Sequence, residues 1–271
     1  MCAAPRSTIS DDVRAVTDNL TEAMRFFGRA RDNGYVRELP GAALIYCGLD
    51  YAAFNAGVMS QPVAGDAAAL EQSINGPAAQ FESRNLRWSY WYCDDYVGKP
   101  LVRRARLLLE RHHMSELTEA PGMVADHVAP PSRALPALEI RAVADVATRS
   151  AFAHITSIAF EVPWNICREI YGSERAWQGT FRGFVGYANG MAIVSTAAVV
   201  KAGVVGIYSV GTLPGHRGRG YAETLMRHVL GVVREETGVE RTVLQSTRSG
   251  QHLYSKMGYR QITNYTVFIT D

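Results

Sequence analysis

Apolar and polar positions alternate along the second half of the chain with a regularity that separates strands from helices. Alternating or continuous runs of β-branched and aromatic residues predict strands at 138–143, 181–187, 191–200, 204–212, 241–246, 259–263 and 265–269. Apolar residues three or four positions apart predict helices at 145–160, around 164–171, from about Arg217 onward and at 250–257. This order of elements is that of an α/β domain.

The first half has a less regular pattern. A helix is expected from Asp11 to about Asn33, because apolar residues recur on one face. The other elements predicted are strands at 42–47, 53–58 and 88–93 and helices at 66–84 and 101–111. Residues 127–137 contain three prolines, which interrupt helices and central strands. We therefore expect an N-terminal α/β domain over 1–126, a linker over 127–137 and a second domain over 138–271.

Residues 206–222 have the order expected of a phosphate-binding turn. A β-branched strand stops at Pro214, a turn rich in glycine and arginine follows, and an amphipathic helix comes next. The first amides of a helix have no partner within it and lie at the positive end of its dipole, so an anion accepts hydrogen bonds from several of them. Gly218 and Gly220 let the backbone approach such a ligand without an intervening Cβ.

The spacing Arg217-x-x-Gly220-x-Ala222 matches the Arg/Gln-x-x-Gly-x-Gly/Ala signature of the GNAT superfamily of acyl-CoA-dependent N-acyltransferases, which this chain resembles. Residues 244–259 resemble the fifth strand, fourth helix and following turn of that family, through a Leu-Tyr-x-x-x-Gly-aromatic run. The resemblance covers residues 138–271 and implies a mixed, mostly antiparallel central sheet flanked by helices. Residues 1–126 lack the signature, so they are either a degenerate copy of the same fold or an unrelated α+β cap.

The resemblance also implies where acetyl-CoA binds and which group protonates its thiolate. Val210, Gly211 and Thr212 correspond to the strand whose free backbone groups bind the pantetheine arm, and an amide there would polarise the thioester carbonyl. Tyr254 corresponds to the acid that protonates the leaving thiolate; the alternative is that it only packs its helix against the sheet. The residues expected to bind the cofactor are Val210, Gly211, Thr212, Arg217, Gly218, Arg219, Gly220, Tyr221, Ala222 and Ser249.

The general base is harder to assign. Many family members carry a glutamate on the fourth strand, yet residues 204–212 contain no acidic residue. Glu161 and Tyr208 are the nearest candidates, each acting through a water molecule; Glu161 fits a solvated loop carboxylate equally well. The expected reaction is direct transfer of an acetyl group from acetyl-CoA to a primary amine in a ternary complex. The alternatives are an acyl-CoA sensor without turnover, or hydrolysis or decarboxylation on the same scaffold.

Composition narrows the range of partners. Lys+Arg 28 against Asp+Glu 26 gives a net charge of +2, which does not favour a general nucleic-acid binder. The cysteines Cys2, Cys47, Cys93 and Cys167 form no Cys-x-x-Cys pair and predict neither a disulfide framework nor a metal site. With no apolar leader and no membrane span in the sequence, we expect a cytoplasmic monomer or homodimer. Its acceptor would be a small-molecule or peptide amine that the sequence does not identify.

Overall fold

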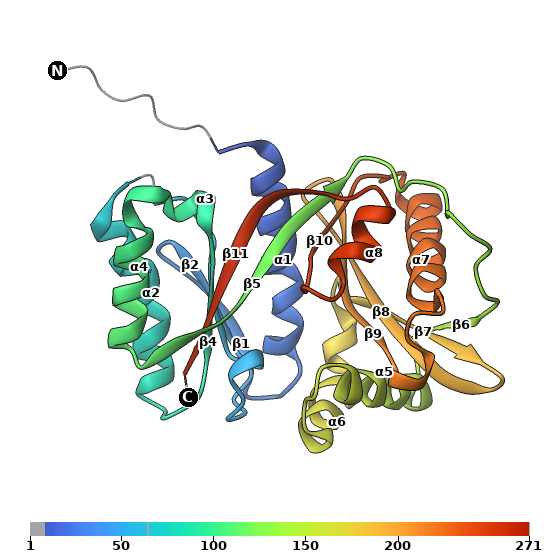
Figure 1. Cartoon of the computed structure of the whole chain (residues 1–271). Coiled ribbons are helices and arrows are strands. Elements are labelled where there is room, and N and C mark those ends of the chain that lie inside the picture. The colour runs from blue at the N-terminus through green and yellow to red at the C-terminus, as the bar shows by residue number, and fades with distance from the viewer. Residues whose placement is uncertain (1–8, 64, 271) are drawn as a thin grey trace.

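The computed structural model describes residues 9–63 and 65–270, and within these ranges eleven strands form one continuous sheet (Figure 1). The strands are β1 (Tyr35–Leu39), β2 (Ala42–Tyr46), β3 (Ala56–Met59), β4 (Ser89–Cys93), β5 (Met114–Ala125), β6 (Glu139–Ala142), β7 (Arg182–Ala188), β8 (Met191–Lys201), β9 (Val204–Thr212), β10 (Thr242–Gln245) and β11 (Arg260–Thr270). The helices are α1 (Asp11–Arg29), α2 (Ala67–Glu82), α3 (Asp94–Val97), α4 (Val102–Arg111), α5 (Val146–Ala159), α6 (Trp164–Gly172), α7 (Tyr221–Thr237) and α8 (Gln251–Lys256). Cys2 lies outside the described residues.

The predicted α/β class is confirmed, with differences at particular elements. β1 and β5 were not predicted, and α1 ends at Arg29 because the Asp32-Asn33-Gly34 segment forms a turn. The two strands predicted at 259–263 and 265–269 are one strand, β11. Its register against β5 shifts between Gln261 and Thr263, and such a bulge breaks the alternation of side chains on which the prediction depended.

The two halves of the chain repeat one arrangement. In residues 138–271, β6, β7, β8 and β9 form an antiparallel series, after which α7 connects β9 to the parallel strand β10. In residues 1–126, β1, β2 and β3 are antiparallel, and α2 connects β3 to the parallel strand β4. Each half therefore contains a β-meander followed by a β-α-β unit.

Each half contributes its last strand to the part of the sheet formed by the other half. The sheet order is β1-β2-β3-β4-β11-β5-β10-β9-β8-β7-β6, so β5 from the first half pairs with β10 of the second. β11 from the second half pairs with β4 of the first, and the two exchanged strands also pair with each other. Figure 1 shows β5 and β11 running side by side across the molecule. The backbone hydrogen bonds of the sheet therefore cross the expected division of the chain.

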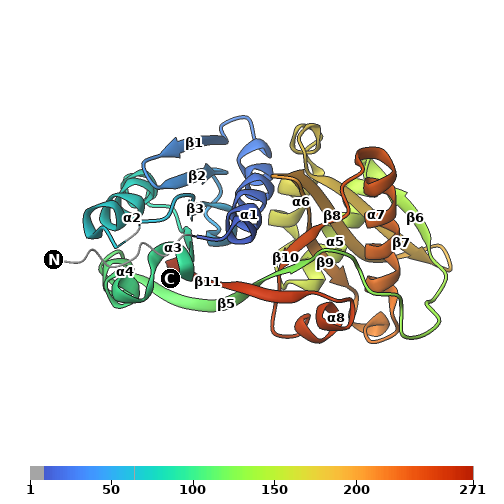
Figure 2. The same ribbon diagram turned by 90° about the horizontal axis from the view of Figure 1, so that it is seen from above.

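Helix α1 lies between the two halves (Figure 2). Asn19 on α1 is fully buried, and its amide nitrogen donates to the carbonyl oxygens of Val199, Lys201 and Val204. A Cβ on Gly206 of β9 would lie 1.9 Å from Asn19 Oδ1, so only glycine permits this approach. The N-terminal helix thus packs directly on the second half.

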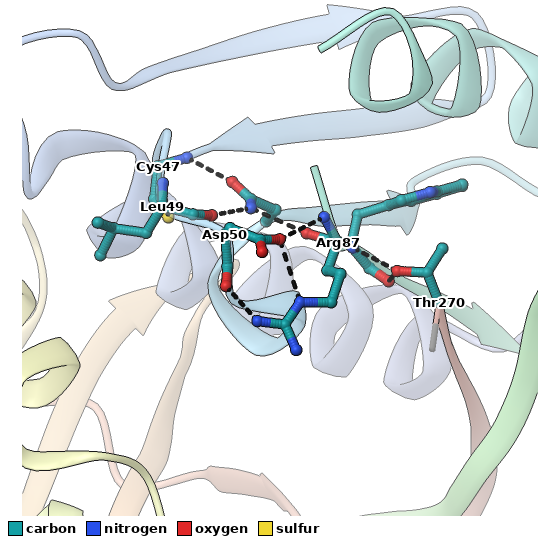
Figure 3. Close-up of polar contacts among 7 residues, drawn as sticks. Cys47, Leu49, Asp50, Arg87 and Thr270 are labelled. Atoms are coloured by element: carbon teal, nitrogen blue, oxygen red, sulfur yellow. Dashed lines mark hydrogen bonds and ion pairs between the residues drawn. The ribbon is translucent and has the colours of Figure 1, made fainter. Parts of the chain in front are cut away.

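The end of β11 contacts the first half near the loop after β2 (Figure 3). Asn55 in this loop is fully buried; its Oδ1 accepts from the amides of Cys47 and Gly48, and its Nδ2 donates to the carbonyls of Leu49 and Arg87. Next to Arg87, the amide of Trp88 donates to Thr270 Oγ1 at 2.9 Å. One asparagine therefore organises the loop beside which β11 ends.

Candidate functional site

A cleft of about 610 Å³ lies where the end of β9, the start of α7 and the short helix α8 meet. Nine of the ten residues predicted to bind the cofactor line this cleft: Val210, Gly211, Thr212, Arg217, Gly218, Gly220, Tyr221, Ala222 and Ser249. Tyr254, predicted as the catalytic acid, lines it as well. Residues from two separate sequence motifs thus meet at one cavity.

The turn between β9 and α7 is shaped by two glycines. After a single 3-10 turn over Pro214–His216, Gly218 and Gly220 have φ values of +74° and +93°. This left-handed backbone cannot belong to a right-handed helix, so α7 begins at Tyr221 and the prediction of a first turn near Arg217 is wrong. Arg217 Nε instead donates to Thr212 O at 3.0 Å and holds the turn against the end of β9.

Strand β9 parts from its neighbour β10 beside the cleft. The two strands pair only at Val205 and Gly206, whereas β9 continues to Thr212. Ser209 has a φ of +50°, and the register of β9 against β8 shifts across this residue, which marks a bulge. The backbone from Ile207 to Thr212 therefore has no sheet partner on its β10 side.

Gly211 also allows a close contact between α5 and β9. The bulge precedes it, and a Cβ on Gly211 would lie 2.9 Å from Ala159 Cβ and 3.3 Å from Ser195 Oγ. The glycine therefore lets the last turn of α5 lie close to β9. Ala159 and Phe160, from that end of α5, line the same cleft.

Tyr254 is buried on α8 with 8% of its surface exposed. Its ring packs over Gly250, where a Cβ would lie 2.7 Å from Tyr254 Cε2, and stands edge-on to Tyr259 with 5.9 Å between ring centroids. Burial raises the pKa of Tyr254 to about 12. Because this value lies well above neutrality, the phenol keeps its proton.

Three predicted residues are not on the cleft wall. Tyr208 donates its hydroxyl hydrogen to Asn19 Oδ1 at 2.7 Å on the α1 side of the sheet, and burial raises its pKa well above the usual range. Glu161 follows the cleft-lining Phe160 but is exposed, with a φ of +56°. Arg219 is exposed on the turn. The structure therefore brings neither candidate base into the cleft.

The cleft also has lining residues that sequence reasoning missed. Ser132 and Arg133 come from the expected linker, and Glu223, Thr247, His252 and Lys256 are further polar residues of the lining. Glu223 is buried, and its Oε1 accepts from Arg227 Nε and Nη2 at 2.9 and 2.7 Å. Since the carboxylate is neutralised by Arg227, the cleft presents a net positive charge. Among the described residues, no group of three His, Cys, Asp or Glu is placed to hold a metal ion.

The comparisons with known proteins agree with this geometry. Residues 149–259 match the model of the acetyltransferase (GNAT) family. A GCN5-related N-acetyltransferase from Kribbella flavida is similar in structure, with a TM-score of 0.68 and 16% identity over 97% of this chain and 96% of that one. Another from Sphaerobacter thermophilus has a TM-score of 0.57 and 16% identity over 99% and 96% of the two chains.

The fold likeness extends to a two-domain relative. A tandem GNAT protein from the clavulanic acid biosynthesis pathway has a TM-score of 0.53 and 12% identity over 89% of this chain and 80% of that one. No match was found among curated proteins. The described helices are all too short or too polar to cross a membrane. At these identities the solved structures show the fold, and they show it over both halves, so residues 1–126 are not an unrelated cap. Residues 149–259 therefore match the acetyltransferase (GNAT) family, and the GNAT-like fold extends over the first half of the chain as well.

Proposed function

We propose that this protein transfers an acetyl group from acetyl-CoA to a primary amine, directly and within a ternary complex. The observation that carries the proposal is the meeting of three features in one cleft: the glycine turn before α7, the unpaired edge of β9, and the buried phenol of Tyr254. The glycine turn suits the pyrophosphate of CoA, and the unpaired edge of β9 suits the amides of its pantetheine arm. The phenol of Tyr254 suits protonation of the leaving thiolate.

The positive end of the cleft would hold the phosphates. Tyr221, Ala222 and Glu223 supply the first amides of α7, which lack partners within the helix and lie at the positive end of its dipole. The guanidinium of Arg217 and the small Gly218 and Gly220 lie on the same turn. With Glu223 neutralised by Arg227, the lining suits a ligand that carries several negative charges.

The unpaired part of β9 would bind the pantetheine arm and act on the thioester. The backbone from Val210 to Thr212 has no sheet partner on its β10 side, so its groups other than Thr212 O, which accepts from Arg217, would hydrogen-bond the amides of the arm. A backbone amide there would stabilise the oxyanion that forms when a neutral amine attacks the carbonyl carbon. The C–S bond then breaks, and Tyr254 gives its proton to the thiolate sulfur. Tyr254 is suited to this step because its raised pKa keeps it protonated.

The proton lost by the attacking amine needs an acceptor. Tyr208 is poorly suited, because its hydroxyl is bound to Asn19 and burial keeps it protonated. Glu161 is the remaining candidate, and its exposure beside Phe160 is compatible with action through a water molecule. We propose Glu161 in this role; Glu161→Gln should then lower turnover at neutral pH and leave the Kd for CoA unchanged.

A thermal-shift titration with acetyl-CoA, CoA and ATP tests the cofactor assignment. A ligand at about one hundred times its Kd adds about 2.7 kcal/mol of stability. We expect both CoA species to raise the Tm and ATP to leave it unchanged. A set of amines, with detection of released thiol, then tests the transfer itself. The absence of any shift with CoA would contradict the assignment.

One observation favours a second candidate, an acyl-CoA sensor that binds without turnover. Neither Glu161 nor Tyr208 lines the cleft. In addition, β9, the strand on which many family members carry a glutamate, contains no acidic residue that could act directly as the base. A sensor would show the thermal shift with CoA but release no thiol with any amine. Thiol release from acetyl-CoA without an acceptor would instead indicate hydrolysis.

A further inference from the structure

The segment 127–137, expected as a linker, is fastened to both helices that border the cleft. The amide of Ala129 donates to Met257 O at 2.9 Å, directly after α8. Thr224 Oγ1, in the first turn of α7, donates to Pro136 O at 3.3 Å. Between these two contacts, Ser132 and Arg133 line the cleft. The connection between the two halves is therefore a wall of the candidate cofactor site.

Arg133 lies directly over the phosphate turn. Its Nη2 donates to Gly218 O at 3.4 Å, which is a long hydrogen bond for a guanidinium. The same nitrogen is 3.2 Å from the position that a Cβ on Gly220 would occupy. None of the ion pairs formed within residues 9–63 and 65–270 includes Arg133. A cation is thus placed at the turn without a carboxylate to neutralise it.

We propose that Arg133 binds a phosphate group of CoA. The inference rests on the proposed function, since it assumes that CoA occupies this cleft. An arginine fork matches two phosphate oxygens, so the guanidinium would exchange its long bond to Gly218 O for a bidentate, charge-assisted contact. CoA carries a diphosphate bridge and a separate 3′-phosphate, and the same recognition chemistry serves either.

Isothermal titration calorimetry on the full chain tests the proposal. CoA and 3′-dephospho-CoA are each titrated into the natural sequence, Arg133→Ala and Arg103→Ala. Arg103 is an exposed arginine on α4, far from the cleft in sequence and absent from its lining, so its loss controls for net charge. We expect Arg133→Ala to raise the Kd for CoA about tenfold, the loss of one charge-assisted contact, and Arg103→Ala to leave it unchanged.

The second ligand identifies the phosphate. If Arg133 binds the 3′-phosphate, 3′-dephospho-CoA binds the natural sequence and Arg133→Ala equally. If Arg133 binds the diphosphate, both ligands weaken by the same factor in Arg133→Ala. Arg133→Lys retains the charge without the fork, so its Kd should fall between those of the natural sequence and Arg133→Ala.

A second readout needs no variant. Arg133 is exposed in a segment without regular structure, so trypsin should cleave after it, and CoA bound to its side chain should slow that cleavage. An unchanged Kd for CoA in Arg133→Ala, with no protection of this bond, would overturn the proposal and leave the cofactor site in place. Failure of the natural sequence to bind CoA would instead overturn the proposed function, and this inference with it.

Discussion

At the scale of single residues, the candidate acid depends on a glycine in the preceding turn. Tyr254 packs over Gly250, and any larger side chain at that position would push the ring out of its place in the cleft wall. Tyr259 packs edge-on against the same ring, but its hydroxyl is hydrogen-bonded to Thr242 Oγ1 at 2.9 Å. Two neighbouring tyrosines therefore have different roles, one at the cleft and one in the core.

This difference predicts that replacing tyrosine by phenylalanine lowers turnover at Tyr254 and lowers stability at Tyr259. Tyr254→Phe removes the proton donor, so kcat should fall by about 10²-fold or more while the Kd for CoA stays within about twofold. Tyr259→Phe should lower stability through loss of the Thr242 hydrogen bond but keep kcat. Steady-state kinetics and calorimetry on both variants check this. Equal turnover in Tyr254→Phe and the natural sequence would remove Tyr254 from the reaction.

Gly220 gives a second prediction at this scale. Gly220→Glu places a carboxylate and added bulk at the phosphate turn, close to Pro136 and Arg133. We expect CoA to cause no thermal shift in this variant. The matched control is Gly203→Glu in the β8–β9 hairpin, where φ is +72° and a Cβ would meet open space. Both positions have a positive φ, so Gly203→Glu controls for placing a glutamate on left-handed backbone away from the cleft. A CoA response retained in Gly220→Glu would show that the site lies elsewhere.

At the scale of elements, local patterns predicted most of the structure. In residues 138–271 most of the predicted elements match within one residue, because their apolar periodicity and turn residues are local signals. β5 was missed because residues 115–119 are largely exposed and polar and the strand contains Pro121 and Gly122. Its place in the sheet comes from pairing with β10 and β11, which are distant in sequence.

The loop beside the end of β11 offers a prediction for an element (Figure 3). Asn55→Ala would remove the partner of the buried Cys47 amide, the half-buried Gly48 amide and the Arg87 carbonyl, whereas Leu49 O would still accept from the amide of Tyr51. We expect a loss of about 3 kcal/mol in the free energy of unfolding. Arg87→Ala is the control: its ion pair with Asp50 is about half exposed on both sides, so its loss should cost about 1 kcal/mol or less. Urea denaturation measures both, and similar losses in the two variants would contradict this account of the loop.

At the scale of the whole molecule, the two halves differ at the N-termini of their corresponding helices, α2 and α7. In the first half, the carboxylate of Asp66 accepts from the amides of Ala68 and Ala69 at the start of α2. An acid therefore already occupies the amides that would receive a phosphate, and its charge repels a second anion. β3 also remains paired with β4 from Ala56 to Val58, so no strand opens beside α2 as β9 does beside α7.

This asymmetry predicts one cofactor per chain. Calorimetric titration with CoA should give a stoichiometry of about one, and Gly220→Glu should abolish the whole signal. Asp66→Asn, which retains the cap without the charge, should leave the stoichiometry at one. Two binding events in the natural sequence, or a residual event in Gly220→Glu, would show that the first half binds CoA as well.

The sequence by itself determined the features that depend on neighbouring residues. The glycine and arginine turn, the helix after it and the tyrosine motif follow from local backbone preferences and spacing, and nine predicted residues line one cleft. Tertiary structure alone decided which distant segments meet. It placed Arg133 over the turn, bound Tyr208 to Asn19, left Glu161 outside the cleft and exchanged β5 with β11. These arrangements depend on pairing and packing between residues far apart in the chain, for which a local pattern carries no signal.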